Sequence, residues 1–365
     1  MDTIRFPFYA RMALTLIALA LTCVILSIAA NIFIPLVFGL LIAILLLPIN
    51  KFFENKLHLG RSLSPVLSIA LFVSVLVSFV YFLVLQFIGF SGDFPVLRKR
   101  FLQMVDSLQH WLHYKLHINN NQQTEYLNKS MNEIMGSVAH SISNVFISIT
   151  SILLLTVFVL IFTFFILYYR KLLMKFALFL FKVEHQPKVN EVIMETKSMI
   201  YAYVFGLVIE MVLISVVNCT MFLIMGVQYA LLLGVMAAVL NIIPYLGIYT
   251  SIIICMIVTL ANSTGNMAIE VGVGLFIVHL LDSNILFPRI IGGRVKMNPF
   301  ITIIAVIAGQ SLWGVPGMFL FIPITGIIKL ICERVEGLEA WGLLIGVEEV
   351  EKKPKRKLKV KLPKE

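Results

Sequence analysis

The last third of the sequence carries a few ionisable side chains inside long apolar segments, and these are the strongest candidates for chemistry. Glu210 lies ten residues into one apolar segment, and His279 and Asp282 lie near the end of another. A charge at membrane depth costs about 2.5 kcal/mol or more, so such a group usually faces a cavity or a partner. His279 and Asp282 are three residues apart, share one helix face and could relay a proton. A structural hydrogen bond or an ion pair with a nearby arginine is the alternative.

Two apolar segments in the same region are interrupted by helix-breaking residues. Residues 227–260 are interrupted near Pro244, and residues 300–328 near Pro316. A pair of Gly/Pro-interrupted apolar segments is typical of a transporter binding site at the bilayer midplane, although a structural kink is the alternative. Pro244 should also free the carbonyl of residue 240. The candidate residues of a substrate or ion path are Glu210, Asn241, Pro244, Tyr245, Gly247, His279, Asp282, Asn284, Gly309, Gln310, Gly314, Pro316 and Gly317.

The composition indicates that these segments lie in a membrane. Of the 365 residues, 60% are hydrophobic and only 13% are charged, whereas soluble domains carry about 25% charged residues. Each interrupted segment would exceed a hydrocarbon core of about 30 Å as one straight helix, while each half is too short to span it. We therefore predict an all-α polytopic membrane protein with about eight hydrophobic segments, namely six spans plus two re-entrant or broken helical hairpins. Eight full spans are the alternative.

Polar residues divide the chain into five expected parts. These are N-terminal membrane helices 1–3 (1–90), a polar helical insert outside the membrane (91–146), a fourth span with a basic cytoplasmic loop (147–198), a transport region with both broken hairpins (199–333) and a basic cytoplasmic tail (334–365). The first two helices should form a hairpin that turns at Asn31. Positive loops face the cytoplasm, so the basic loops 50–63 and 170–198 place both termini inside.

Several functions are disfavoured by what the sequence lacks. It contains no G-x-x-x-x-G-K-[ST], H-E-x-x-H or G-x-S-x-G pattern, which argues against ATP hydrolysis and common hydrolase chemistry. His110, His113 and His117 share a helical face, but no cysteine is near and only Asp106 could join them. The basic tail accounts for much of the net charge of +10. We therefore predict no enzyme activity, cofactor, metal site or nucleic-acid partner, and contact with membrane lipid.

The region 199–333 resembles the autoinducer-2 exporter family of bacterial membrane proteins. The resemblance rests on motifs whose order and spacing over about 135 residues are specific, namely Asn241-Ile242-Ile243-Pro244-Tyr245-Leu246-Gly247, then Asp282-Ser283-Asn284-Ile285-Leu286-Phe287-Pro288 with Gly292, then Asn298-Pro299-Phe300 with Gly309, Gly314, Gly317 and Pro323. It implies a multi-pass protein of the bacterial inner membrane that forms homo-oligomers and exports the quorum-sensing furanone autoinducer-2. Some relatives act as sodium or lithium/proton antiporters through a Pro-x-x-Gly-Pro motif. Here Ile248 stands in place of the second proline.

The sequence thus predicts a secondary transporter that exports a small solute such as autoinducer-2, driven by a proton or cation gradient. Its site should lie between the two broken hairpins and the helices of Glu210 and Asp282. A sodium or lithium/proton antiporter, a passive facilitator and a non-transporting membrane scaffold are the alternatives.

Overall fold

The computed structural model describes residues 7–116, 151–244, 246–290 and 297–347. Its helices are α1 (Phe8–Ile28), α2 (Ala30–Lys56), α3 (Leu63–Leu116), the helix Ser151–Phe179, α5 (Gln186–Ile224), α6 (Ala230–Leu240), α7 (Leu246–Asn262), α8 (Gly265–Leu281), α9 (Phe287–Ile290), α10 (Pro299–Cys332) and α11 (Glu339–Ile345). Seven apolar helices among the described residues are long enough to cross a membrane, and α6 and α7 are shorter apolar helices. No strand occurs in these ranges. The prediction of an all-α polytopic membrane protein is confirmed.

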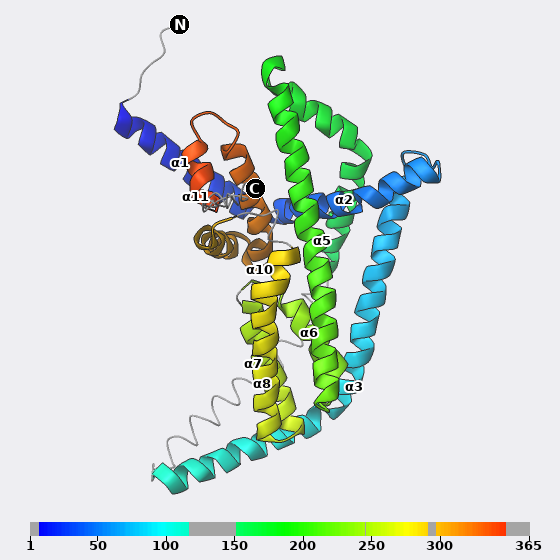
Figure 1. Ribbon diagram of the computed structural model, residues 1–365, viewed down its shortest axis with the longest axis vertical. Coiled ribbons are helices and arrows are strands. Elements are labelled where there is room, and N and C mark those ends of the chain that lie inside the picture. The colour runs from blue at the N-terminus through cyan, green and yellow to red at the C-terminus, as the bar shows by residue number, and fades with distance from the viewer. Residues whose placement is uncertain (1–6, 117–150, 245, 291–296, 348–365) are drawn as a thin grey trace, which may run out of the picture.

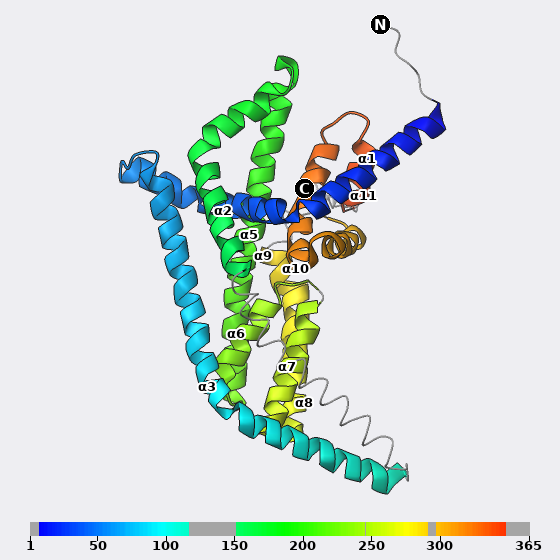
Figure 2. The ribbon, with the colours of Figure 1, turned by 180° about the vertical axis from the view of Figure 1, so that it is seen from behind.

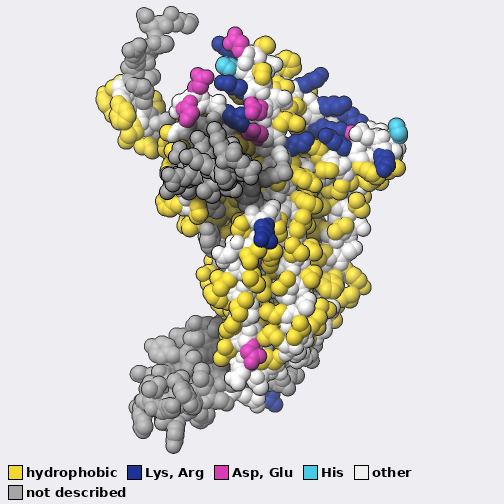
Figure 3. Space-filling model, viewed as in Figure 1, with side chains coloured by type: hydrophobic (Ala, Val, Ile, Leu, Met, Phe, Trp, Pro, Cys, Tyr) yellow, Lys and Arg dark blue, Asp and Glu magenta, His cyan; other side chains and the backbone are white. Residues whose placement is uncertain are grey.

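The long helices form an elongated bundle. In Figures 1 and 2, α5, α8 and the first part of α3 run roughly parallel, and α2 crosses them near one end. Figure 3 shows that lysine and arginine side chains gather at this end, whereas the middle of the molecule is covered by hydrophobic side chains. We refer to the end where lysine and arginine gather as the basic end. This distribution is typical of a helical membrane protein in which positive charge gathers on one side of the membrane.

The two N-terminal helices do not form the expected hairpin at Asn31. The helical hydrogen bonds continue across the joint, since the Ala29 N–H donates to Ile25 at 2.9 Å and the Phe33 N–H donates to Ala29 at 3.0 Å. The chain therefore bends at Ala29, and α1 and α2 run away from the joint in opposite directions (Figures 1 and 2). The joint also packs against α10, where the Trp313 indole N–H donates to the Leu26 carbonyl at 2.9 Å.

The third span and the expected insert share one helix. α3 extends without interruption from Leu63 to Leu116, well beyond the apolar part that ends near residue 90. The rest of the predicted insert lies outside the described residues, as does His117. The side chains of His110 and His113 also lie outside the described part, so the metal hypothesis stays untested.

The first broken segment folds back on itself. α6 ends at Leu240, α7 begins at Leu246, and the two short helices lie side by side against α5 and α8 (Figures 1 and 2). The backbones cross so closely that a Cβ atom on Gly247 would lie 1.9 Å from the Leu240 carbonyl oxygen. Only glycine fits at this crossing, and the segment returns toward the end from which it came.

The second broken segment also reverses. Gly314 lies inside α10 with φ +63° and ψ −145°, a conformation that only glycine adopts easily. A Cβ atom on Gly317 would lie 1.9 Å from the Gly309 carbonyl oxygen, so the two halves of α10 touch backbone to backbone. Far from this contact between the two halves of α10, Gly326 of the second half lies beside Met297, which lies just before the first half. Both broken segments are therefore helical hairpins.

Candidate functional site

Two acidic side chains from distant parts of the chain meet inside the bundle. Glu210 projects from α5 and is 7% exposed, and Asp282 begins a π-helical turn after α8 and is 4% exposed. The two carboxyl groups interact directly. The π-helical turn adds a residue to the helix and redirects the following side chains, and such turns are frequent at functional sites. Both residues were predicted from the sequence as part of a substrate or ion path, but the sequence does not show that they are neighbours.

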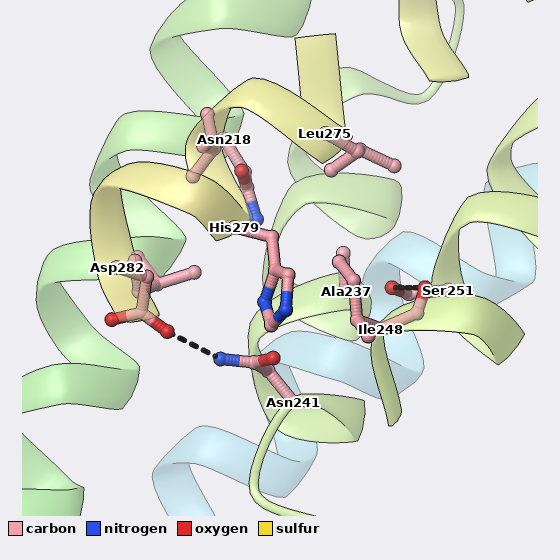
Figure 4. Close-up of a pocket in the computed structure, with 10 residues that line it drawn as sticks. Asn218, Ala237, Asn241, Ile248, Ser251, Leu275, His279 and Asp282 are labelled. Atoms are coloured by element: carbon pink, nitrogen blue, oxygen red, sulfur yellow. Dashed lines mark hydrogen bonds between the residues drawn. The ribbon is translucent and has the colours of Figure 1, made fainter. Parts of the chain in front are cut away.

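The break in the first hairpin supplies a partner for this pair. Asn241 directly follows α6, and its side-chain amide donates to the Asp282 carboxylate at 3.0 Å, as the dashed line in Figure 4 shows. The other Asp282 oxygen, Oδ1, and Glu210 Oε2 have no hydrogen-bond partner among the described residues. Two ionised carboxylates in contact repel each other strongly in a low-dielectric interior. The arrangement is therefore suited to hold a proton or a small cation.

The backbone at this break differs from the expectation. Pro244 was expected to leave the carbonyl of Leu240 free, but that carbonyl accepts the Ile243 N–H at 3.0 Å. The Gly247 N–H likewise donates to the Ile243 carbonyl at 3.0 Å. The chain passes the proline by making tight turns, and these turns satisfy the carbonyls that a straight helix would have lost.

A cavity of about 390 Å³ opens beside the acidic pair. It lies between α5, the first hairpin, the π-helical turn and the start of α10. Its walls are formed by Tyr203, Leu207, Glu210, Asn241, Ile242, Pro244, Ile248, Tyr249, His279, Asp282, Ser283, Phe287, Met297, Pro299, Thr302 and Ile322. Small-molecule sites occupy about 300–1,000 Å³ and are mostly apolar with a few polar groups, so this cavity has the size and character of such a site.

The structure brings only some of the predicted residues to the cavity. Glu210, Asn241, Pro244, His279 and Asp282 line it. Those that do not are Gly247, at the hairpin crossing, and Asn284, whose exposed amide donates to the Leu280 carbonyl at 2.7 Å. Tyr245 lies outside the described residues.

The break of the second hairpin does not face the cavity. Gly309 and Gly317 are occupied by their mutual contact, and Gly314 marks the turn between them. Gln310 is exposed, and neither it nor Pro316 lines the cavity. The neighbouring Trp313 fixes this part of the hairpin against α1. The second hairpin contributes its other end instead, through Met297, Pro299, Thr302 and Ile322.

Several polar residues of the site escaped the sequence analysis. Tyr203 lies two turns before Glu210 on α5, and Asn218 lies two turns after it and is 2% exposed. Ser251 of α7 is 1% exposed. The spacing of seven or eight residues from Glu210 was the available signal, because it places Tyr203 and Asn218 on the same face of the helix.

Comparison with known proteins identifies the family. A family model described as "AI-2E family transporter" matches residues 14–337. The chain belongs to the AI-2E transporter family. It is similar to YrrI, an inferred transport protein of Bacillus subtilis (strain 168), with 24% identity over 311 residues that cover 82% of this chain and 85% of YrrI.

Two relatives from Escherichia coli (strain K12) match shorter parts of this AI-2E family chain. YhhT, an inferred transport protein, is 34% identical over 122 residues, which cover 33% of this chain and 35% of YhhT. The AI-2 transport protein TqsA is 29% identical over 121 residues, which cover 33% of this chain and 35% of TqsA. The chain is thus a multi-span membrane protein of a transporter family, as the sequence predicted.

Proposed function

We propose that this chain is a secondary transporter that moves a small polar solute through the cavity of about 390 Å³ and is driven by a proton or cation gradient. The observation that carries the proposal is the contact between the nearly buried carboxyl groups of Glu210 and Asp282 in the cavity wall. A proton or cation bound by this pair removes the repulsion between α5 and the π-helical turn, and its release restores that repulsion. Because the solute would occupy the same cavity, its binding and ion binding would influence each other.

The lining of the cavity supports a small hydroxylated solute. Hydroxyl groups of Tyr203, Tyr249, Ser283 and Thr302 are spread among apolar side chains, a mixture that suits a compact ring with several oxygens. The relative TqsA is named for transport of AI-2. We therefore propose autoinducer-2, or a furanone of similar polarity, as the solute. Export is the proposed direction because the motifs resemble those of exporters.

A sodium or lithium/proton antiporter is the second candidate. The unpartnered oxygens of Glu210 and Asp282 favour it, because carboxylate oxygens are the ligands that hard cations prefer. The carbonyls at the hairpin break favour a proton over a metal cation, since those of Leu240 and Ile243 already accept backbone hydrogen bonds.

The charge distribution supports an orientation in the bacterial inner membrane. Lysine and arginine side chains gather at the end that holds the α2–α3 loop and the start of α5 (Figure 3). We therefore propose that this end faces the cytoplasm, in line with the positive-inside rule and with the predicted cytoplasmic termini. The homo-oligomeric state and the five-part division of the chain remain predictions.

The test compares two tryptophan variants of the purified protein in proteoliposomes loaded with labelled autoinducer-2 under a pH or sodium gradient. Thr302→Trp fills the cavity, whereas Ile303→Trp is the matched control because Ile303 is 41% exposed and does not line the cavity. We expect gradient-driven efflux from wild type and Ile303→Trp and a loss of about tenfold or more in Thr302→Trp, a blocked-site effect of more than about 1.4 kcal/mol. Downhill movement alone from wild type would indicate a facilitator. No movement from folded wild type, together with partners that co-purify, would indicate a scaffold.

A further inference from the structure

A second, much smaller void lies beyond the acidic pair, deeper among α5, α7 and α8. Its volume is about 10 Å³, and it is lined by Ile214, Asn218, Ala237, Asn241, Ile248, Ser251, Leu275, Val278, His279 and Asp282. Figure 4 shows His279 between Asn218 and Asn241, with Asp282 at one side. We call this void the inner chamber. A space of this size holds one water molecule when several polar groups surround it.

The residues that line the inner chamber carry three buried polar atoms that lack a hydrogen-bond partner among the described residues. They are Asn218 Oδ1, His279 Nδ1 and Asp282 Oδ1. A buried polar atom without a partner is costly because it has given up its hydrogen bonds to water. Structures normally satisfy such atoms with a buried water, which makes about three hydrogen bonds. A water-sized void whose lining residues carry unpartnered polar atoms therefore indicates a water site.

The other ring nitrogen of His279 already has a neighbour. His279 Nε2 lies 3.3 Å from the Ser283 hydroxyl oxygen. This contact leaves Nδ1 as the nitrogen that is available to the chamber. The imidazole can therefore accept a proton at Nδ1 while Nε2–H donates to Ser283.

The inner chamber and the large cavity share part of their lining. Asn241, His279 and Asp282 line both the chamber and the large cavity, so the Asn241–Asp282 hydrogen bond of 3.0 Å lies at the boundary between them. Ala237 and Leu275 of the chamber lining also belong to an apolar cluster of fully or nearly buried residues, which comprises Phe222, Val227, Ala230, Leu233, Ala237, Cys255, Val271 and Leu275. Asp282 therefore connects the two spaces, and a proton that reaches it from the large cavity next meets the polar residues of the inner chamber.

We propose that the inner chamber is a proton-relay site in which one water, positioned by Asn218, connects Asp282 with His279. When Asp282 carries a proton, its O–H bond breaks and the proton passes to the water. The water gives one of its own protons to His279 Nδ1, so the water is regenerated, the carboxylate is negative and the imidazolium is positive. The inference rests on the proposed function, because it adds a route for the coupling proton.

The titratable groups that face Asp282 on this route come from two helices, α5 and α8. Glu210 contacts Asp282 from α5, and His279 approaches from α8. Tyr203 of α5 and Tyr249 of α7 line only the large cavity. Glu210 can therefore supply or withdraw the proton at Asp282, whereas His279 is the titratable group that lines the chamber beside Asp282.

The first test asks whether the chamber is hydrated, and it needs no transport activity. Asn218→Cys and Val216→Cys are made in a chain whose four cysteines are replaced by alanine, and both are exposed to Ag⁺ in proteoliposomes. Val216 lies on the same helix near the same depth but is 59% exposed on the outer surface, where lipid would cover it. Thiolates form in water and not in hydrocarbon, so we expect modification at least about tenfold faster at position 218. Equal rates would overturn the proposal and leave the proposed function standing.

The second test asks whether Asn218 is needed for proton movement. A pH-sensitive dye inside proteoliposomes reports proton entry under an imposed gradient for wild type, Asn218→Leu and Asn218→Ser. Leucine has the same branched shape and number of heavy atoms but no polar side-chain atom, so we expect proton movement to fall by about 10²-fold, in line with the loss of a positioned proton-transfer group. Serine keeps a hydroxyl and room for water, so it should restore most of the rate, which a merely structural role of Asn218 would not predict.

The outcomes separate the two proposals. Wild-type proton movement that persists unchanged in Asn218→Leu overturns the relay alone. An absence of proton movement in folded wild type overturns the relay together with proton coupling. A slow Asn218→Leu variant and a fast Asn218→Ser variant support the relay.

Discussion

Replacing Gly247 by alanine tests whether the backbones of the first hairpin cross in contact at Leu240 and Asn241. The new Cβ atom would lie 1.9 Å from the Leu240 carbonyl oxygen and 2.6 Å from its carbonyl carbon. Ordinary C···O contacts are about 3.3 Å, so the two backbones must separate by more than 1 Å. Alanine in a helix gains about 1 kcal/mol over glycine, whereas overpacking costs about 1–3 kcal/mol or more. Because backbone atoms cannot rotate away, we expect a net destabilisation of about 2 kcal/mol.

Gly272→Ala is the matched control on α8. Its added Cβ atom meets the Met256 sulfur at 2.6 Å, and a methionine side chain can rotate away. The assay uses protein whose other three cysteines are replaced by alanine and heats it in detergent with a thiol-reactive dye, which then reports exposure of Cys255, 0% exposed in the fold. At roughly 2–4 °C per kcal/mol, Gly247→Ala should melt several degrees below wild type, and Gly272→Ala within a few degrees of it. A Gly247→Ala variant that melts at or above the wild-type temperature would refute the hairpin crossing.

Two further predictions concern contacts between helices of the bundle. Glu54→Gln leaves the partly buried guanidinium of Arg170 without its carboxylate partner, so unfolding should become easier by about 1–3 kcal/mol, and the double variant with Arg170→Gln should recover part of the loss. A double-mutant cycle of melting temperatures measures this, and additive effects would contradict the pairing. Trp313→Phe removes the 2.9 Å hydrogen bond to Leu26 and should lower stability by about 1–3 kcal/mol. An unchanged melting temperature would show that this bond does not fasten the second hairpin to α1.

The positions of the helices and of both breaks could be predicted from the sequence, because they depend on local properties. Long apolar segments form helices in a membrane since every backbone group must be satisfied within the segment. Pro244 and Gly314 interrupt such segments by their own covalent geometry. The acidic residues were evident because a carboxyl group in an apolar helix is rare and costly.

The parts that could not be predicted depend on packing between distant segments. Nothing local shows that the crossing at Gly309 and Gly317 directs the second break away from the cavity and leaves Thr302 to line it. The tight turns that satisfy the Leu240 carbonyl, and the helical hydrogen bonds that continue through Ala29, likewise depend on the path of the chain and not on residue type. These turns and this continuous hydrogen bonding are features of backbone geometry, which the spacing of residue types does not encode.

The most direct test of the central claim, that the Glu210–Asp282 pair couples solute movement to an ion gradient, is uphill transport by Asp282→Asn. Wild-type and variant proteoliposomes receive equal autoinducer-2 on both sides and an imposed pH gradient, and a parallel set receives a solute gradient alone. Asparagine keeps the size of the side chain but cannot exchange a proton. We expect wild type to accumulate solute against its gradient and Asp282→Asn to show only downhill movement. An Asp282→Asn variant that concentrates the solute as wild type does would contradict the account.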